Sequence, residues 1–221
     1  MRVALCRVAA VLCERSKLNR RFLESLVVLG LLISGATAHA GQLTTSFLTD
    51  TGRTTSDVGH FFDITTGLNP LTITSFDVNV DDTDSFTLSV YTRSGTSSGF
   101  EGSSMGWSLQ SSTSATGAGG DFPSFVDIDD FFLPSQSTVG IYLFFSDNVG
   151  IKYNFGDIPA SNSDLSLDFG SVGEGLFGGV FFTPRTWSGT IRYDVVPEPS
   201  TALLLSSGLL ALGLRRRHSR R

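Results

Sequence analysis

Two glycine-containing motifs have the spacing of loops that carry out chemistry. Residues 102–106 (GSSMG) match the G-x-S-x-G turn of serine hydrolases, which needs a following helix and a later histidine. Residues 173–178 (GEGLFG) match the G-x-G-x-x-G loop that binds a dinucleotide when a helix follows it. The first motif lies in a Gly/Ser-rich stretch and has only His218 downstream, while residues 180–184 after the second motif predict a strand. We therefore interpret both motifs as turns.

The sequence contains few histidines and cysteines that could catalyse a reaction or bind a metal. His60 is the only histidine between residues 41 and 200, and both cysteines, Cys6 and Cys13, lie near the N-terminus. A zinc site or a histidine-based triad would need partners that this region hardly offers, because it contains no cysteine either. We expect no catalytic residue, no disulfide and no cofactor, and we expect His60 to be a half-buried or strand-edge side chain.

Two acidic clusters could supply oxygen ligands to a calcium ion. The candidate ligands are Asp82 and Asp84 in the first cluster and Asp127 and Asp129 in the second. Neither cluster has EF-hand spacing, so we favour carboxylates exposed to water in turns. An alternative is a weak hydrolase with two exposed carboxylates, which would need a cleft that holds them roughly 5–10 Å apart.

Tryptophan side chains could stack against sugar rings on an exposed sheet face. The candidates are Trp107 and Trp187, with Tyr91, Tyr153 and Tyr193 as further aromatic residues. Packing in a core, or against Arg185, explains the same residues without a ligand. The sequence is compatible with both arrangements.

The segments that would position these residues have the patterns of β-strands. Ser85–Tyr91 alternates polar and apolar residues, which places Phe86, Leu88 and Val90 on one face. The apolar positions of residues 71–80 change phase, which predicts a β-bulge near Thr74 and Ser75. Further predicted strands are His60–Ile64, Trp107–Ser111, Phe125–Ile128, Val139–Phe145, Lys152–Phe155, Leu165–Phe169, Val180–Thr183 and Thr190–Val195.

The predicted strands are typical of a β-sandwich. Residues 41–196 contain no helical repeat of ten or more residues, and clusters of Gly, Ser, Asn, Asp and Pro separate the strands. We interpret Ser111–Gly120 as a loop. Adjacent phenylalanines would fill the layer between two sheets, namely Phe61-Phe62, Phe131-Phe132, Phe144-Phe145 and Phe181-Phe182.

The charges divide the chain into three parts. Residues 41–200 contain five basic and 19 acidic residues, so their formal charge is 5 − 19 = −14. This acidic region is a poor match for a phosphate backbone, so we expect no nucleic-acid partner. The other eleven basic residues lie in the two terminal segments, which we expect to stay on the cytoplasmic side of a membrane.

The C-terminal segment predicts a membrane anchor. Pro197, Glu198 and Pro199 precede an apolar run over residues 202–214, which as a helix would be about 20 Å long. Five arginines follow this run and would stop it from crossing the bilayer: Arg215, Arg216, Arg217, Arg220 and Arg221. We therefore predict a short transmembrane helix.

The N-terminal segment predicts a signal peptide. Arg20 and Arg21 precede the apolar residues 26–33. Ala38 and Ala40 then supply the small-x-small pattern of a signal peptidase site, with the cut before Gly41. We predict that residues 1–40 are removed during export.

Two resemblances to known families follow from these residues. The Pro-Glu-Pro motif, the apolar run and the arginine cluster together resemble the PEP-CTERM tail of exported bacterial proteins, which implies an exosortase-type processing enzyme as a partner. Residues 62–64, 71–79, 90–91, 106–107 and 183–193 are similar to a β-sandwich module of secreted bacterial proteins. This second resemblance implies a jelly-roll-like fold and brings no activity.

We therefore expect an all-β protein with a single jelly-roll-like β-sandwich over residues 41–196. A signal peptide over residues 1–40 precedes it, and a PEP-CTERM sorting tail with a transmembrane helix over residues 197–221 follows it. The expected role is that of a non-enzymatic surface or extracellular-matrix protein, exported across the inner membrane, anchored there at first and then placed at the cell surface or outside. The alternative is a module that binds carbohydrate or exopolysaccharide, with or without calcium.

Overall fold

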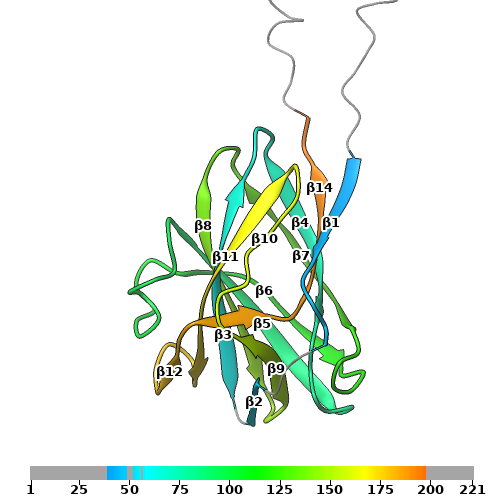
Figure 1. Ribbon diagram of the computed structural model, residues 1–221, viewed down its shortest axis with the longest axis vertical. Helices are drawn as coiled ribbons and strands as arrows, with labels where there is room; N and C mark the ends of the chain where they lie inside the picture. The colour runs from blue at the N-terminus through cyan, green and yellow to red at the C-terminus, as the bar shows by residue number, and fades with distance from the viewer. Residues whose placement is uncertain (1–38, 49–51, 56, 198–221) are drawn as a thin grey trace, which may run out of the picture. The chain divides into compact units, whose positions relative to one another are not determined.

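The computed structural model describes residues 39–48, 52–55 and 57–197, and this part of the chain is all-β (Figure 1). Its strands form antiparallel sheets, and it contains no helix. The predicted signal peptide and the predicted sorting tail with its transmembrane helix lie outside the described residues, apart from His39 and Ala40 of the first and Pro197 of the second.

The described residues form the following strands, in chain order. They are β1 (His39–Thr44), β2 (Gly52–Thr55), β3 (Val58–Thr66), β4 (Leu71–Val78), β5 (Ser85–Ser94), β6 (Ser108–Thr116), β7 (Ser124–Leu133), β8 (Thr138–Ser146), β9 (Gly150–Phe155), β10 (Ala160–Ser161), β11 (Leu165–Glu174), β12 (Phe181–Phe182), β13 (Arg185–Trp187) and β14 (Gly189–Val195).

Eight of these strands pair in a nested way, first with last. β1 pairs with β14, β3 with β8, β4 with β7, and β5 with β6. This is the pattern of one long hairpin, with the β5–β6 connection at its tip and the two described chain ends at its open end. Because the first strand pairs with the last, residues far apart in the sequence must meet before this pattern is complete.

Two further pairings fold the long hairpin into two sheets. β14 also pairs with β4, which gives a four-stranded sheet of order β1-β14-β4-β7. β8 also pairs with β5, and β11 adds to the other side of β3, which gives the larger sheet of order β10-β11-β3-β8-β5-β6 with β12 paired to β11. A small third sheet has the order β13-β9-β2.

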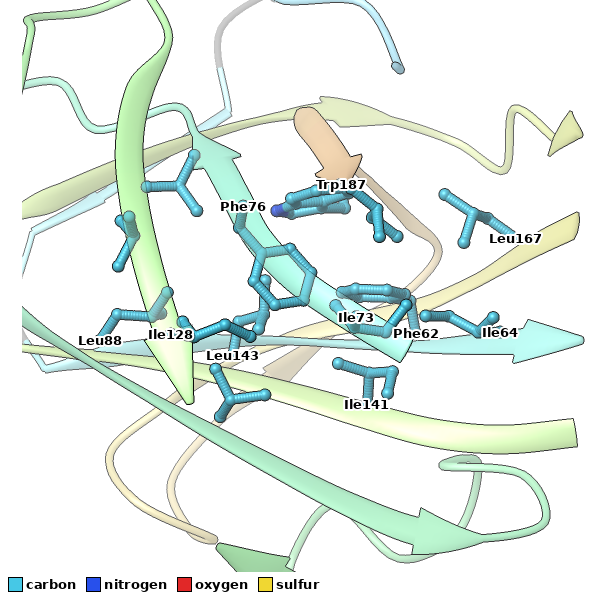
Figure 2. Packing of buried hydrophobic residues seen from close by; sticks show 14 of the residues in the cluster. Phe62, Ile64, Ile73, Phe76, Leu88, Ile128, Ile141, Leu143, Leu167 and Trp187 are labelled. Atoms are coloured by element: carbon cyan, nitrogen blue, oxygen red, sulfur yellow. The ribbon is translucent and has the colours of Figure 1, made fainter. Parts of the chain in front are cut away.

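The apolar faces of the two larger sheets share one core. Phe62 and Ile64 on β3, with Ile141 and Leu143 on β8, pack toward Ile73 and Phe76 on β4 (Figure 2). Trp187 on β13 lies over the same cluster. Each of these side chains is at most 2% exposed, so burial of apolar surface is the main stabilising contribution to this domain.

The bulge predicted from the phase change in β4 is confirmed. The pairing of β4 with β7 shifts register between Ile73 and Ser75, and its pairing with β14 shifts between Arg192 and Tyr193. The extra residue, Thr74, donates a hydrogen bond from its hydroxyl to the carbonyl of Arg192 (3.3 Å). The bulge allows both halves of β4 to direct apolar residues into the core.

Two other expectations were wrong. Residues 111–116 are not a loop but part of β6, where they pair with β5. The sequence does not reveal this strand, because its Ser and Thr residues show no alternation with apolar residues. The two members of an adjacent phenylalanine pair do not both lie in the layer between the sheets, because successive residues of a strand point to opposite faces. Phe62 is in the core and Phe61 on the outer face, and Phe132 is 59% exposed whereas Phe131 is buried.

His60 is a core residue, contrary to the expectation of a half-buried or edge position. It lies on the core face of the central strand β3, is 0% exposed and contacts the rings of Phe62 and Tyr153 edge-on. Its Nε2 donates to the carbonyl of Arg185 (3.2 Å), while Nδ1 has no hydrogen-bond partner among the described residues. Burial lowers the pKa of His60 to about 3, the Arg185 carbonyl acts in the opposite direction, and the Arg185 charge adds to the lowering.

The neutral state of His60 should make the domain less stable in acid. The ordinary histidine pKa of about 6.5 applies to the unfolded chain, so between pH 6.5 and 3 the unfolded state binds a proton that the folded state does not. The contribution is fully present above pH 6.5 and is lost as the pH falls, by about 1.4 kcal/mol per pH unit. We expect urea unfolding between pH 7 and 4 to show a steeper loss in the wild type than in His60→Gln. Parallel pH profiles of the two proteins would contradict this assignment.

Gly59 on β3 lies directly under an aromatic ring. A methyl group at Gly59 would overlap the ring of Tyr142, which extends from the neighbouring strand β8. The Tyr142 ring is 0% exposed and stacks at 3.8 Å on Phe61, so it has little space to move.

We expect Gly59→Ala to destabilise the domain by about 1–3 kcal/mol, the usual cost of overpacking a filled site. The matched control is Gly102→Ala, because the nearest atom to its added methyl is 3.8 Å away on Phe181. That control should stay within about 0.5 kcal/mol of the wild type. Urea unfolding followed by tryptophan fluorescence measures both, and equal stabilities would show that the Tyr142 ring relaxes freely.

Candidate functional site

The two described ends of the chain lie side by side in the four-stranded sheet. β1 pairs antiparallel with β14, so that Ala40 is opposite Asp194 and Gly41 is opposite Tyr193 (Figure 1). After β14, the amide of Val196 donates to the carbonyl of Pro70 (2.9 Å), and Pro197 follows at once. The predicted cleavage bond between Ala40 and Gly41 therefore lies within a paired strand, and the predicted sorting motif begins one residue beyond the last backbone contact.

The other predicted sorting and cleavage residues lie outside the described residues, namely Ala38, Glu198, Pro199, Arg215, Arg216, Arg217, Arg220 and Arg221. Among residues 39–48, 52–55 and 57–197, no helix is long and apolar enough to span a membrane.

Tyr193 holds the start of β1 against the sheet by packing and by hydrogen bonding. A methyl at Gly41 would overlap its ring, so only glycine at this position allows the ring to cover β1. Asn162 donates from Nδ2 to the Tyr193 hydroxyl (2.7 Å) and to the Gln42 carbonyl (3.2 Å). The Tyr193 hydroxyl in turn donates to Asp164 Oδ2 (3.0 Å). The β10–β11 turn thus connects β1 and β14 through side chains.

The Tyr193 hydroxyl is a permanent donor in this network. Burial raises the pKa of Tyr193 to about 12, with a further rise from Asp164 and an opposite effect of Asn162. Its proton is therefore present throughout the physiological pH range.

On the outer face of β14, Arg192 forms a bidentate ion pair with Asp77 on β4 (2.7 and 2.6 Å). This ion pair connects β14 to β4, and the Tyr193 network connects β14 to β1.

Trp187 is not available to a ligand, which corrects the expectation of a stacking residue. Its side chain is 2% exposed, stacks on Phe62 with ring centroids 5.1 Å apart and meets Phe76 edge-on at 6.0 Å. Tyr153 and Tyr193 are also buried, at 5% and 1% exposure. These residues pack in the main core, where the apolar rings contribute to stability and not to binding.

Trp107 lies in a second aromatic group, on the opposite face of the larger sheet. We call this group the outer aromatic cluster; it comprises Phe61, Tyr91, Trp107, Tyr142, Phe144, Phe177 and Phe181. Trp107 is half-buried there and meets Phe61 and Tyr142 edge-on, with centroids 5.7 and 6.0 Å apart. Its indole Nε1 donates to the carbonyl of Phe100 (3.1 Å).

The loop that carries Trp107 is fixed by polar contacts at its start. Asp63 on β3 accepts hydrogen bonds from the Thr96 hydroxyl (2.5 Å) and the Ser97 amide (2.7 Å). Arg93 lies over the Phe100 ring, with its guanidinium carbon 3.4 Å from the centroid, and donates to the Thr96 carbonyl. Phe100 itself is 42% exposed. The loop therefore presents an apolar surface beside Trp107 on a defined scaffold.

The four calcium candidates do not form a metal site among the described residues. Asp82 accepts a hydrogen bond from the Gly150 amide (2.9 Å), and Asp84 is exposed in the turn before β5. Asp127 and Asp129 point outward from β7. In the described ranges, no group of three or more His, Cys, Asp or Glu residues could hold a metal ion.

The two chemistry-like motifs form turns, as the sequence predicted. Residues 102–106 lie in the loop before β6, where Gly106 has a φ of 83°. The second motif begins at the end of β11, reverses at Gly175 (φ 78°) and Phe177 (φ 53°), and leads into β12. Strands follow both motifs, so neither supplies the helix that a hydrolase or a dinucleotide site requires.

Sequence reasoning missed the residues that join the two chain ends. These residues include Asn162 and Asp164, and the signal that could have located them is the Asn-Ser-Asp sequence between two strands, which is typical of a turn that caps its own backbone. In the sequence, Gly41 stands out only as the residue after the predicted cleavage site. Its partner Tyr193 is 152 positions away, since 193 − 41 = 152, and no local pattern connects the two.

Comparisons with known proteins give one informative match. No curated protein matches the chain. Among solved structures, a T13 IBDV viral particle is similar at 9% identity and a TM-score of 0.25, covering 76% of this chain and 41% of that chain. The infectious bursal disease virus VP2 subviral particle is similar at 10% identity and a TM-score of 0.23, covering 81% and 50%. This chain thus spans at most half of each of those chains.

The informative match covers the segment that follows the sheet. Residues 195–217 match the PEP-CTERM protein-sorting motif, and this range includes the Pro-Glu-Pro sequence, the apolar run and three of the five arginines. The match begins at the last residue of β14. The chain therefore carries a PEP-CTERM sorting motif directly after an all-β domain.

Proposed function

We propose that this protein is a non-enzymatic exported protein of the cell surface or extracellular matrix, sorted by an exosortase-type enzyme through residues 195–217. The sorting motif carries this proposal, because it implies an exported protein that the processing enzyme recognises at the membrane. The charge pattern supports it, since −14 on residues 41–200 contrasts with the basic terminal segments. The absence of catalytic residues stays a prediction.

We infer further that the domain is a jelly roll. The support is the nested pairing of eight strands and their division into sheets of order β1-β14-β4-β7 and β3-β8-β5-β6. Wrapping one long antiparallel hairpin into two sheets is how a jelly roll places two Greek keys around one core. β10, β11 and β12 extend the larger sheet beyond these eight strands.

The open end of this hairpin suits a precursor that has both ends in one bilayer. β1 begins and β14 ends next to each other, at the pair formed by His39 and Val195. A signal peptide before β1 and a transmembrane helix after β14 would therefore leave the domain from the same place. We propose that residues 1–40 are removed during export and that residues beyond Val196 anchor the domain until the tail is cut.

Replacement of Pro197, Glu198 and Pro199 by alanine should abolish processing of the tail. We expect the wild-type secreted form to lack the residues after this motif, and the triple variant to remain in the membrane fraction with its C-terminus at Arg221. Intact-mass spectrometry and cell fractionation measure both. The control Pro159→Ala changes an exposed loop proline outside the motif and should be processed normally. A secreted wild-type protein that still ends at Arg221 would contradict cleavage.

A second candidate function is binding of an uncharged polysaccharide at the outer aromatic cluster. The observation that favours it is the combination of half-buried Trp107 with the exposed Phe100 and Met105, which are 42% and 78% exposed. Aromatic rings on a fixed loop can stack against the C–H faces of sugars, as in a pocket with a few convergent polar groups. The acidic body would repel polysaccharides of the same charge.

Trp107→Ala should then weaken retention in affinity electrophoresis through neutral polysaccharide gels by about tenfold, or about 1.4 kcal/mol. The matched control is Phe132→Ala, because Phe132 is an exposed aromatic residue on β7, away from this cluster. Circular dichroism verifies that both variants fold. Runs with and without calcium test the metal contribution, and identical mobility of wild type and Trp107→Ala in every gel would exclude this function.

A further inference from the structure

The bond between Ala40 and Gly41 lies inside β1, and the residues before and after it along the chain pair with β14. His39, Ala40, Gly41 and Gln42 are opposite Val195, Asp194, Tyr193 and Arg192 in an unbroken register. The Tyr193 ring covers Gly41, and Asn162 holds the carbonyl of Gln42. The residues on both sides of the bond are thus part of the folded sheet.

A peptidase cannot act on a bond in this state. Peptidases of this kind bind their substrates as an extended strand, and the backbone groups that they use are the ones a sheet neighbour also uses. Here β14 already occupies one edge of β1, and Asn162 contacts the other edge. Cleavage therefore requires that β1 separates from β14.

The order of the strands determines when β1 is free. β14 is the only ladder partner of β1 among the described strands, and residues 45–188 separate the two. β1 leaves the membrane first and β14 last, so β1 has no partner until the end of the chain has been exported. The pairing also closes a long loop, which makes it a late step of folding.

We infer that docking of β14 closes the signal peptidase site, so that the leader must be removed before the C-terminal strand is in place. The inference rests on the proposed export signal. Cleavage of the leader is then possible only until β14 completes the four-stranded sheet. A precursor that folds with its leader attached stays uncut.

An order-of-addition experiment with the full-length precursor in detergent tests this timing. In one arm, urea-unfolded precursor is diluted into buffer that already contains bacterial signal peptidase. In the other arm, it is diluted first, allowed to refold and then given the same peptidase. We expect cleavage between Ala40 and Gly41 in the first arm and at least a tenfold slower reaction in the second, measured by intact-mass spectrometry.

A double variant separates opening of β1 from general instability. Asn162→Ala with Tyr193→Phe removes the side-chain hydrogen bonds that hold β1, keeps the aromatic ring at position 193 in the core and leaves residues 38–44 unchanged. The refolded variant should be cut at least tenfold faster than the refolded wild type. The control is Phe86→Leu, which weakens the core from β5 in the other sheet. At a urea concentration where this control and the double variant have the same free energy of unfolding, the control should be cut more slowly than the double variant.

The outcomes distinguish this inference from the proposed export signal. Equal cleavage of wild type in both arms would overturn the inference alone. A precursor that is cut at this bond in neither arm would contradict the export signal and, with it, the inference. Faster cleavage of Phe86→Leu than of the double variant would show that global unfolding controls access, which would also overturn it.

Discussion

The insertion of β14 between β1 and β4 is the constraint on which the four-stranded sheet depends. Without it, β1 has no ladder partner among the described strands, and β4 keeps only β7. The Asp77–Arg192 ion pair and the Tyr193 network fix β14 to both neighbours, and Ile191 places its apolar side chain in the shared core. The domain thus becomes complete only when its last strand arrives, so its stability is a property of the whole chain.

Packing must supply the stability of this domain, because the sequence has no cysteine after Cys13. The main core lies between the sheets, and the outer aromatic cluster adds a second buried layer beneath the loops that follow β5 and β11. The two layers share β3, since Phe62 faces one and Phe61 the other. A strand that is apolar on both faces therefore joins the structural core to the surface that we propose as a ligand site.

Local pattern predicted much of the fold. Alternation located the strands around Phe86–Val90, and the phase slip located the bulge at Thr74, because both are properties of neighbouring residues. Pattern failed where hydroxyl side chains line a strand, as in residues 111–116, since Ser and Thr occur in strands and loops alike. It also could not separate Trp187 from Trp107. Whether a tryptophan faces the core depends on the strand that lies opposite, and that information is not local.

Glycines beneath aromatic rings make pairs of positions interdependent. Gly173 and Phe181 face each other on β11 and β12, and Gly41 on β1 lies under the ring of Tyr193 on β14; an added methyl would overlap the ring in both cases. The ring can therefore keep its position only while the residue beneath it is glycine. Homologous sequences should show coupled replacement at these positions, with a larger residue in place of glycine only where the ring has been exchanged for a smaller side chain. Such covariation would identify members of this fold even where their overall sequences have diverged.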